Sequence, residues 1–307
     1  MTQSNALMKT RSNAIRDSFS DKVFIFLVYA FLSIILVVVL YPLIYILSSS
    51  FSSPRAVISG KVWLFPVEPS LAGYRAIFSN PQVMTGYANS IFYTFFGVLI
   101  NVGLTVMLAF PISKSTFYGR NVIMVILIIT MMFSGGLIPY YLTVKNLGLL
   151  DTRWAMLLPS AMAVWQVIIA RTFFQSSIPK ELGEAAELDG CSDIGFLLRV
   201  VLPLSKPILA VLVLMYAVGQ WNAYFEALIF LKTQHLFPLQ IILRNILILN
   251  SIDSSMMVDA NKMAAMQGLR DLLKFSLIVV ATLPVLAIYP FVQKYFVQGI
   301  MIGSLKG

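Results

Sequence analysis

The stretch VFIFLVYAFLSIILVVVLYPLIYIL, residues Val23–Leu47, contains no charged side chain. A helix of about 20 apolar residues matches the thickness of the hydrocarbon core of a bilayer. The run is too long for the core of a signal peptide and no clean cleavage site follows it, so we interpret it as an uncleaved membrane span. The whole chain agrees, because 59% of its 307 residues are hydrophobic and 11% are charged, against about a quarter charged in a soluble domain.

Working outward from this run, we find six apolar stretches that are long enough to cross a membrane as helices. They are Val23–Leu47, Ser90–Ile112, Val122–Val144, Ala155–Phe174, Pro207–Leu231 and Leu272–Phe296. Lipid offers no hydrogen-bond partners to the backbone, so each must be helical, and the alternating segments of a membrane β-barrel are absent. The predicted fold class is an all-α integral membrane protein with six transmembrane helices. We expect a polar N-terminal segment, residues 1–22, followed by one membrane domain, residues 23–307.

The formal net charge of +9 does not indicate a nucleic-acid-binding protein. The basic residues lie in loops and beside apolar segments, where Lys and Arg commonly meet anionic lipid head groups. Cys191 is the single cysteine and His235 the single histidine. Neither has a cluster of further ligands beside it, so we expect no disulfide framework and no metal site.

An even number of spans would leave both termini on one side of the membrane. The short loop 113–120 holds Lys114 and Arg120 and no acidic residue, which favours the cytoplasm for this side. The loops 48–89 and 232–274 also hold basic residues. Charge alone therefore supports this orientation only modestly.

The connection between the fourth and fifth predicted spans, residues 177–203, predicts a helix, a sharp bend and a second helix. Ser177 can cap the first helix, and Gly190 suits the left-handed residue that ends it. Ser192 can cap the second helix, and Pro203 can end it.

A spaced motif runs through the same connection. Glu184-Ala185-Ala186 is followed after three residues by Gly190, and after nine more by Val200, one residue, and then Leu202-Pro203. This pattern resembles the EAA loop of ABC-importer permeases. The resemblance is specific, because the fixed positions must also fall in a loop between two spans.

Four further segments are similar to the maltose-type carbohydrate permeases, and most similar to their LplC/YtcP-like branch, which is often associated with oligosaccharides from complex polysaccharides. They are FSGGLIP at 133–139, NLGLLD at 146–151, GQWN at 219–222 and the chain ending YPFVQKYFVQGIMIGSLKG at 289–307.

The resemblance implies the fold of a type I ABC-importer permease and a set of partners. A second permease, usually a paralogue, would complete the pore in the bacterial cytoplasmic membrane. An ATPase dimer would bind ATP and Mg²⁺ on the cytoplasmic side, where both termini would lie, and an extracytoplasmic binding protein would deliver the oligosaccharide. This chain has no P-loop motif, so we expect no enzymatic activity and no bound cofactor in it.

The resemblance also implies roles for particular residues. Glu184 would pair with a basic group of the ATPase, Ala185 and Ala186 would allow close approach, and Gly190 would set the bend. The remaining motif residues that we expect at this contact are Asp189, Leu202 and Pro203. A second contact is expected from the tail, residues 297–307, with the candidates Gly299, Gly303 and Lys306.

Polar and aromatic side chains inside predicted spans are candidates for a sugar pathway, because such groups are expensive in lipid and tend to serve function. The candidates are Trp165, Gln166, Gln220, Trp221, Asn222, Tyr224 and Glu226. In one continuous helix Gln220 would lie over Tyr224. Interfacial anchoring and helix packing are the competing interpretations for each candidate.

Two other functions remain open from the residues. One is an ABC permease for a solute that is not a sugar. The other is an ion-coupled secondary transporter, which should show inverted repeats and several buried ionisable residues; Glu226 is the one such residue that stands out.

Overall fold

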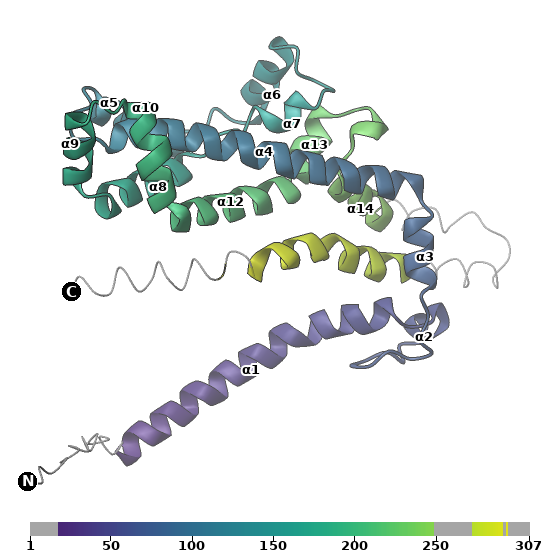
Figure 1. Ribbon diagram of the computed structural model, residues 1–307. Helices are drawn as coiled ribbons and strands as arrows, with labels where there is room; N and C mark the ends of the chain where they lie inside the picture. Colours follow the sequence, from purple (N-terminus) through teal and green to yellow (C-terminus); the bar gives the residue numbers. More distant parts are fainter. Residues whose placement is uncertain (1–17, 249–271, 291–292, 294–307) are drawn as a thin grey trace, which may run out of the picture.

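The computed structural model describes residues 18–248, 272–290 and 293 (Figure 1). Every regular element in this part of the chain is helical. In chain order the elements are α1 Phe19–Ser50, α2 Pro54–Ile58, α3 Ala72–Phe78, α4 Pro81–Ser113, α5 Arg120–Met132, α6 Leu137–Asn146, α7 Trp154–Leu157, α8 Val164–Ser177, α9 Lys180–Leu188, α10 Asp193–Phe196, the π-helix η1 Leu197–Val201, α11 Leu202–Leu204, α12 Lys206–Trp221, α13 Tyr224–Phe230, the 3-10 helix η2 Gln234–Leu236, α14 Leu239–Ile248 and the helix Leu272–Pro290.

Three of the predicted spans are single helices of sufficient length and apolarity to cross a membrane. These are α1, α4 and the helix Leu272–Pro290. The helix α1 begins at Phe19, shortly before the uncharged run, and Ser18 starts it with a capping box formed with Asp21. The all-α fold is thus confirmed in the described residues, and each of the first two predicted spans lies within one continuous helix.

The other three predicted spans are each interrupted. Helices α5 and α6 meet at 116° across a break where Gly136 has φ +84°, a backbone conformation that favours glycine. The fourth span is divided into α7 and α8, and the fifth into α12 and α13. The bent pairs that together are long and apolar enough to cross are α5 with α6, and the segment Asp193–Leu204 with α12. The described residues therefore hold three candidate crossings, or five if each of these two pairs counts as one, so the count of six stays a prediction.

The core of the bundle forms where α4 packs between α8 and α12. Fully buried Ala109, Val167 and Leu212 represent the three helices in this cluster. The hydroxyl groups of Thr105 and Tyr216 are hydrogen-bonded at 2.6 Å, which joins α4 to α12 inside the apolar core. The long helix α4 is therefore the central element of the fold.

Helix α1 lies apart from this bundle (Figure 1). Its buried residues are Ser48, Ser49 and Ser50 at its C-terminal end, where the hydroxyl of Ser276 donates to the carbonyl of Ser50 at 3.3 Å. The first residues of α1 and helix α9 lie toward the left of Figure 1, whereas α2 and α3 lie toward the right. The segment 177–203 therefore lies at the same end of the molecule as the start of the first span.

Candidate functional site: the elbow between α8 and α12

The first arm of the elbow, which we define as residues 177–203, is the helix α9. The sequence places the acidic residue Glu181 in its first turn, where it complements the helix dipole. The prediction that Ser177 caps this helix is wrong. Ser177 is the last residue of α8, and α9 begins at Lys180 with Pro179 before it, because the fixed φ of proline suits a helix start better than a further turn of α8.

The bend of the elbow follows directly from Gly190, as predicted. Gly190 has φ +69°, a region where a β-carbon would clash with the following carbonyl oxygen. Its N–H donates to the carbonyl of Glu187 at 3.0 Å, and the N–H of Cys191 donates to the carbonyl of Ala186 at 2.8 Å. This pair of bonds is the Schellman motif, which satisfies the last carbonyls of the helix while reversing the chain.

The second arm begins with the cap that the sequence predicts. The Ser192 hydroxyl accepts a hydrogen bond from the N–H of Gly195 at 3.2 Å, which starts α10. The arm continues without a break through the π-helix η1 and α11 to Leu204, one residue beyond Pro203. It then meets α12 at 84°.

The two arms differ in how they are held. Helix α9 has no buried residue, whereas Phe196 at the end of α10 is buried in the core formed by α4, α8 and α12. Large apolar side chains project from the elbow without full cover from the described part of the chain; the most exposed are Leu188 at 90% and Ile194 at 71%. The second arm is therefore packed into the bundle, and the first arm is connected to the bundle mainly through the second arm.

A cavity of about 390 Å³ lies between α9 and the loop after α4. Lys114, Arg120 and Lys180 provide positive charge in its lining, and Glu184 and Glu187 provide negative charge. Glu184, the acidic residue of the motif, thus borders a mixed-charge cleft at the end of the molecule where α9 projects.

The remaining motif residues divide between the inside and the outside of the elbow. Ala185 and Asp189 are exposed, as is Pro203, whereas Ala186 and Leu202 are half-buried against the core. Ala186 therefore permits close packing within this chain, and Ala185 alone of the pair faces outward.

Three of the candidate pathway residues are fixed or enclosed by their own chain. Trp221 is buried, and its indole N–H donates to the carbonyl of Ala281 at 2.9 Å. Gln220 is buried against Gly97 of α4. Asn222 is exposed, but its side-chain amide donates back to the carbonyl of Val218 at 2.8 Å.

The other candidates have freer side chains. Trp165 is 56% exposed and Tyr224 is also exposed, while Gln166 and Glu226 are half-buried. The carbonyl oxygens of the Gln166 and Gln220 side chains are buried and have no hydrogen-bond partner within the described residues. The expectation that Gln220 lies over Tyr224 on one helix is wrong, because α12 ends at Trp221 and α13 begins at Tyr224. The tail candidates Gly299, Gly303 and Lys306 lie outside the described residues.

Two arrangements in the structure were missed by the sequence reasoning. Asp193 pairs with Lys114 of the loop after α4. In the loop between α6 and α7, the Asp151 carboxylate accepts the backbone N–H groups of Lys232 and Thr233 at 2.8 and 2.9 Å. One residue of each pair could be singled out from the sequence: Asp151 is part of the NLGLLD segment, and Lys114 is a basic residue of the loop 113–120. Their partners could not be predicted, because these lie far away along the chain.

The comparisons with known proteins agree with this architecture. No family model matches the chain. The protein LplC of Bacillus subtilis is 41% identical over 88% of this chain and 90% of its own length. The polygalacturonan/rhamnogalacturonan transport system permease protein YtcP of the same organism is 39% identical over 94% of this chain and 99% of its own length.

A solved structure decides the assignment. A chain of a bacterial ABC transporter involved in the import of the acidic polysaccharide alginate superposes with a TM-score of 0.82 at 36% identity, over 91% of this chain and 99% of that chain. The chain belongs to the ABC-importer permease family. This permease is therefore a transport subunit and not an enzyme, as its sequence predicts.

Proposed function

We propose that this permease forms half of the translocation pathway of an ABC importer for oligosaccharides derived from polysaccharides. The support for the substrate class comes from relatives whose names specify polygalacturonan/rhamnogalacturonan and arabinooligosaccharides and from a structural neighbour that takes part in alginate import. A second permease completes the pore, and an extracytoplasmic binding protein delivers the sugar. One structural neighbour was solved with an alginate pentasaccharide-bound periplasmic protein, which supports the last partner.

The elbow is the site at which a separate ATPase dimer acts on this permease. The observation that carries this proposal is a helix, α9, that projects from the bundle with no buried residue and bears the motif residue Glu184 beside the cleft described above. Glu184 would pair with a basic group of the ATPase, and the rigid bend at Gly190 would pass the movement of α9 into the second arm. This is rigid-body motion driven by a partner.

This role assigns the orientation of the permease in the membrane. ATP is cytoplasmic, so the elbow faces the cytoplasm. The first residues of α1 lie at the same end of the molecule (Figure 1), so six crossings would put both termini inside the cell. The tail residues Gly299, Gly303 and Lys306 would then be available for a second contact with the ATPase.

The sugar would pass the residues that this chain leaves free to bind it. Trp165 and Tyr224 offer exposed aromatic faces. The side-chain oxygens of Gln166 and Gln220 are buried and have no hydrogen-bond partner in the described residues, so they would reach a sugar only when the surrounding helices move apart. Glu226 and Asn222 near the break between α12 and α13 add polar groups. Sugars are bound through such stacking surfaces and planar amides.

The coupling role is tested by purifying the tagged permease with its ATPase after the changes Glu184→Lys and Gly190→Pro. Proline cannot adopt φ +69°, so the second change destroys the bend. We expect loss of ATPase co-purification and of ATP-driven uptake for both, and unchanged behaviour for Lys206→Glu, an exposed charge at the start of α12 outside the elbow. If both elbow variants retain the ATPase and transport, the docking role is wrong.

The substrate class is tested separately in proteoliposomes that contain the wild-type complex and its binding protein. The panel holds labelled alginate pentasaccharide, oligogalacturonate, arabinooligosaccharide and a dipeptide. Uptake of one or more oligosaccharides supports the proposal. Uptake of the dipeptide alone would refute it.

A further inference from the structure

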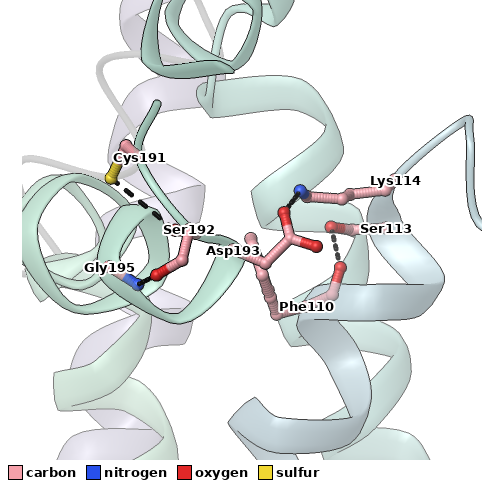
Figure 2. Close-up of polar contacts among 7 residues, drawn as sticks. All are labelled: Phe110, Ser113, Lys114, Cys191, Ser192, Asp193 and Gly195. Carbon is pink, nitrogen blue, oxygen red and sulfur yellow. Dashed lines mark hydrogen bonds and ion pairs between the residues drawn. The ribbon is translucent and has the colours of Figure 1, made fainter. Parts of the chain in front are cut away.

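Lys114 connects the end of the central helix to the second arm of the elbow. It directly follows Ser113, the last residue of α4, and its ammonium group forms an ion pair with the carboxylate of Asp193, the first residue of α10 (Figure 2). Within the described residues this is the one ion pair that meets a 4.0 Å limit. The two partners lie at opposite sides of a junction between α4 and α10 that no backbone hydrogen bond crosses.

The ammonium group is also held by two aromatic rings. Its nitrogen lies 5.1 Å from the ring centre of Phe110 on α4 and 5.8 Å from that of Phe196 on α10, distances within the range of cation–π attraction. Both rings are buried and their centres are 6.4 Å apart. Lys114 thus touches one charged and one aromatic group of the elbow while it remains attached to α4.

The end of α4 is in turn fastened to α8. The guanidinium of Arg171 donates to the carbonyl of Ile112 at 3.2 Å, and the side-chain amide of Gln175 donates to the carbonyl of Ser113 at 3.2 Å. These bonds satisfy terminal carbonyls that would otherwise lack partners. The C-terminal ends of α4 and α8 are therefore joined by hydrogen bonds directly beside Lys114.

Helix α9 needs such a connection, because none of its side chains is buried and Ala186 alone packs against the core cluster. Its residues are exposed or half-buried, and Gly183 offers Phe196 no side chain. A displacement of α9 would be transmitted to α4 through the bend at Gly190 and then through α10. The Lys114–Asp193 pair and the Phe110–Phe196 contact are the points where α10 meets α4.

We propose that Lys114 is a positioning residue that clamps the second arm of the elbow to α4, so that both move as one body when the ATPase displaces α9. This inference rests on the proposed function. An exposed ion pair contributes little to folding stability, and Asp193 is 72% exposed. The clamp therefore acts by keeping the geometry of the junction under load rather than by holding the fold together.

The test measures the distance between two nitroxide labels by electron paramagnetic resonance in the purified complex with its ATPase. The labels are attached to Met107→Cys on α4 and Leu198→Cys on the second arm, two exposed positions, after Cys191→Ser removes the single cysteine. Spectra are compared without nucleotide and after trapping with ATP and vanadate. The distance is measured with the junction intact and after Lys114→Met or Asp193→Asn.

With the junction intact we expect the same distance distribution in both states. In Lys114→Met and in Asp193→Asn we expect that distribution without nucleotide, and a shift or broadening beyond its width after trapping. Lys114→Arg should restore the wild-type behaviour, because a guanidinium can make both the ion pair and the cation–π contact. Lys206→Met, which removes an exposed charge at the same end of the molecule, should change nothing.

Three results overturn the inference. One is a nucleotide-dependent shift with the junction intact. Another is no shift in either clamp variant, and the third is broadening without nucleotide, which would make the pair merely structural. Retention of the ATPase and of transport by both Glu184→Lys and Gly190→Pro refutes the proposed function instead, so the two failures are distinguishable.

Discussion

Replacing Trp221 separates a packing role from a pathway role. Trp221 is 4% exposed, lies in a cluster with Val83 of α4 and Leu277 of the helix Leu272–Pro290, and donates to the carbonyl of Ala281. In soluble proteins a buried Trp→Ala change costs about 3 to 5 kcal/mol. Helices in lipid gain nothing from the hydrophobic effect and depend on packing and hydrogen bonds, so we expect a loss near the lower end, about 3 kcal/mol, for Trp221→Ala.

Trp221→Phe keeps a large ring and removes the indole N–H. The lost hydrogen bond should cost about 1 kcal/mol. The assay is thermal unfolding of the detergent-purified complex, with uptake measured in parallel. The expected order of stability is wild type, Trp221→Phe, Trp221→Ala, and the control Trp165→Ala, whose side chain is largely exposed, should unfold like the wild type. A Trp221→Ala complex that is as stable as the wild type and yet fails to transport would refute the packing argument and favour contact with the sugar.

Two further predictions concern close approach and a loop anchor. A β-carbon on Gly97 would lie 2.8 Å from the Gln220 side chain, so Gly97→Ala should destabilise the purified complex by about 1 to 3 kcal/mol, whereas Gly103→Ala on the same helix meets nothing within 4 Å and should not. For Asp151, hydrogen bonds from the Thr233 hydroxyl and from the N–H groups of Lys232 and Thr233 lower the pKa of the carboxyl to about 2. Because the folded pKa is below the unfolded value, the ionised carboxylate stabilises the fold above about pH 4 and loses this effect as pH falls toward about 2. Asp151→Asn, which tolerates the left-handed φ of +57°, should therefore lower the unfolding temperature by a constant amount from pH 8 to 5; a deficit that changes across that range would contradict this.

The elbow could be predicted in detail because its signals are local. Gly190 and Ser192 act on backbone groups within a few residues, through a left-handed bend and a helix cap. The uncharged run of α1 likewise needs no knowledge of distant residues. The start of α9 was misplaced because Ser177 and Pro179 both resemble helix starts, and sequence alone does not reveal that α8 continues through Ser177.

The packing of the bundle could not be predicted from the same information. The partner of Trp221 is the Ala281 carbonyl, and that of Asp193 is Lys114. No spacing in the sequence indicates either pairing, because the partners lie 60 and 79 residues apart along the chain. The break between α12 and α13 also carries no proline or glycine at residues 222–223. A continuous apolar run therefore predicted one helix where the structure has two.

Exposed apolar side chains on α1 and on the elbow require different explanations. Those of α1 are spread along a helix that carries no charged residue after Lys22 and is of membrane length. Lipid alone can cover them, so their exposure does not by itself require a protein partner. Leu188 projects from α9, whose sequence KELGEAAEL carries four charged residues in nine, a composition that excludes burial in lipid. An apolar side chain that neither lipid nor its own chain covers is satisfied best by another protein. The requirement for a partner at the elbow therefore follows from the charge around Leu188 rather than from its exposure, and Leu188→Glu should weaken ATPase co-purification while Leu36→Met on α1 leaves it unchanged.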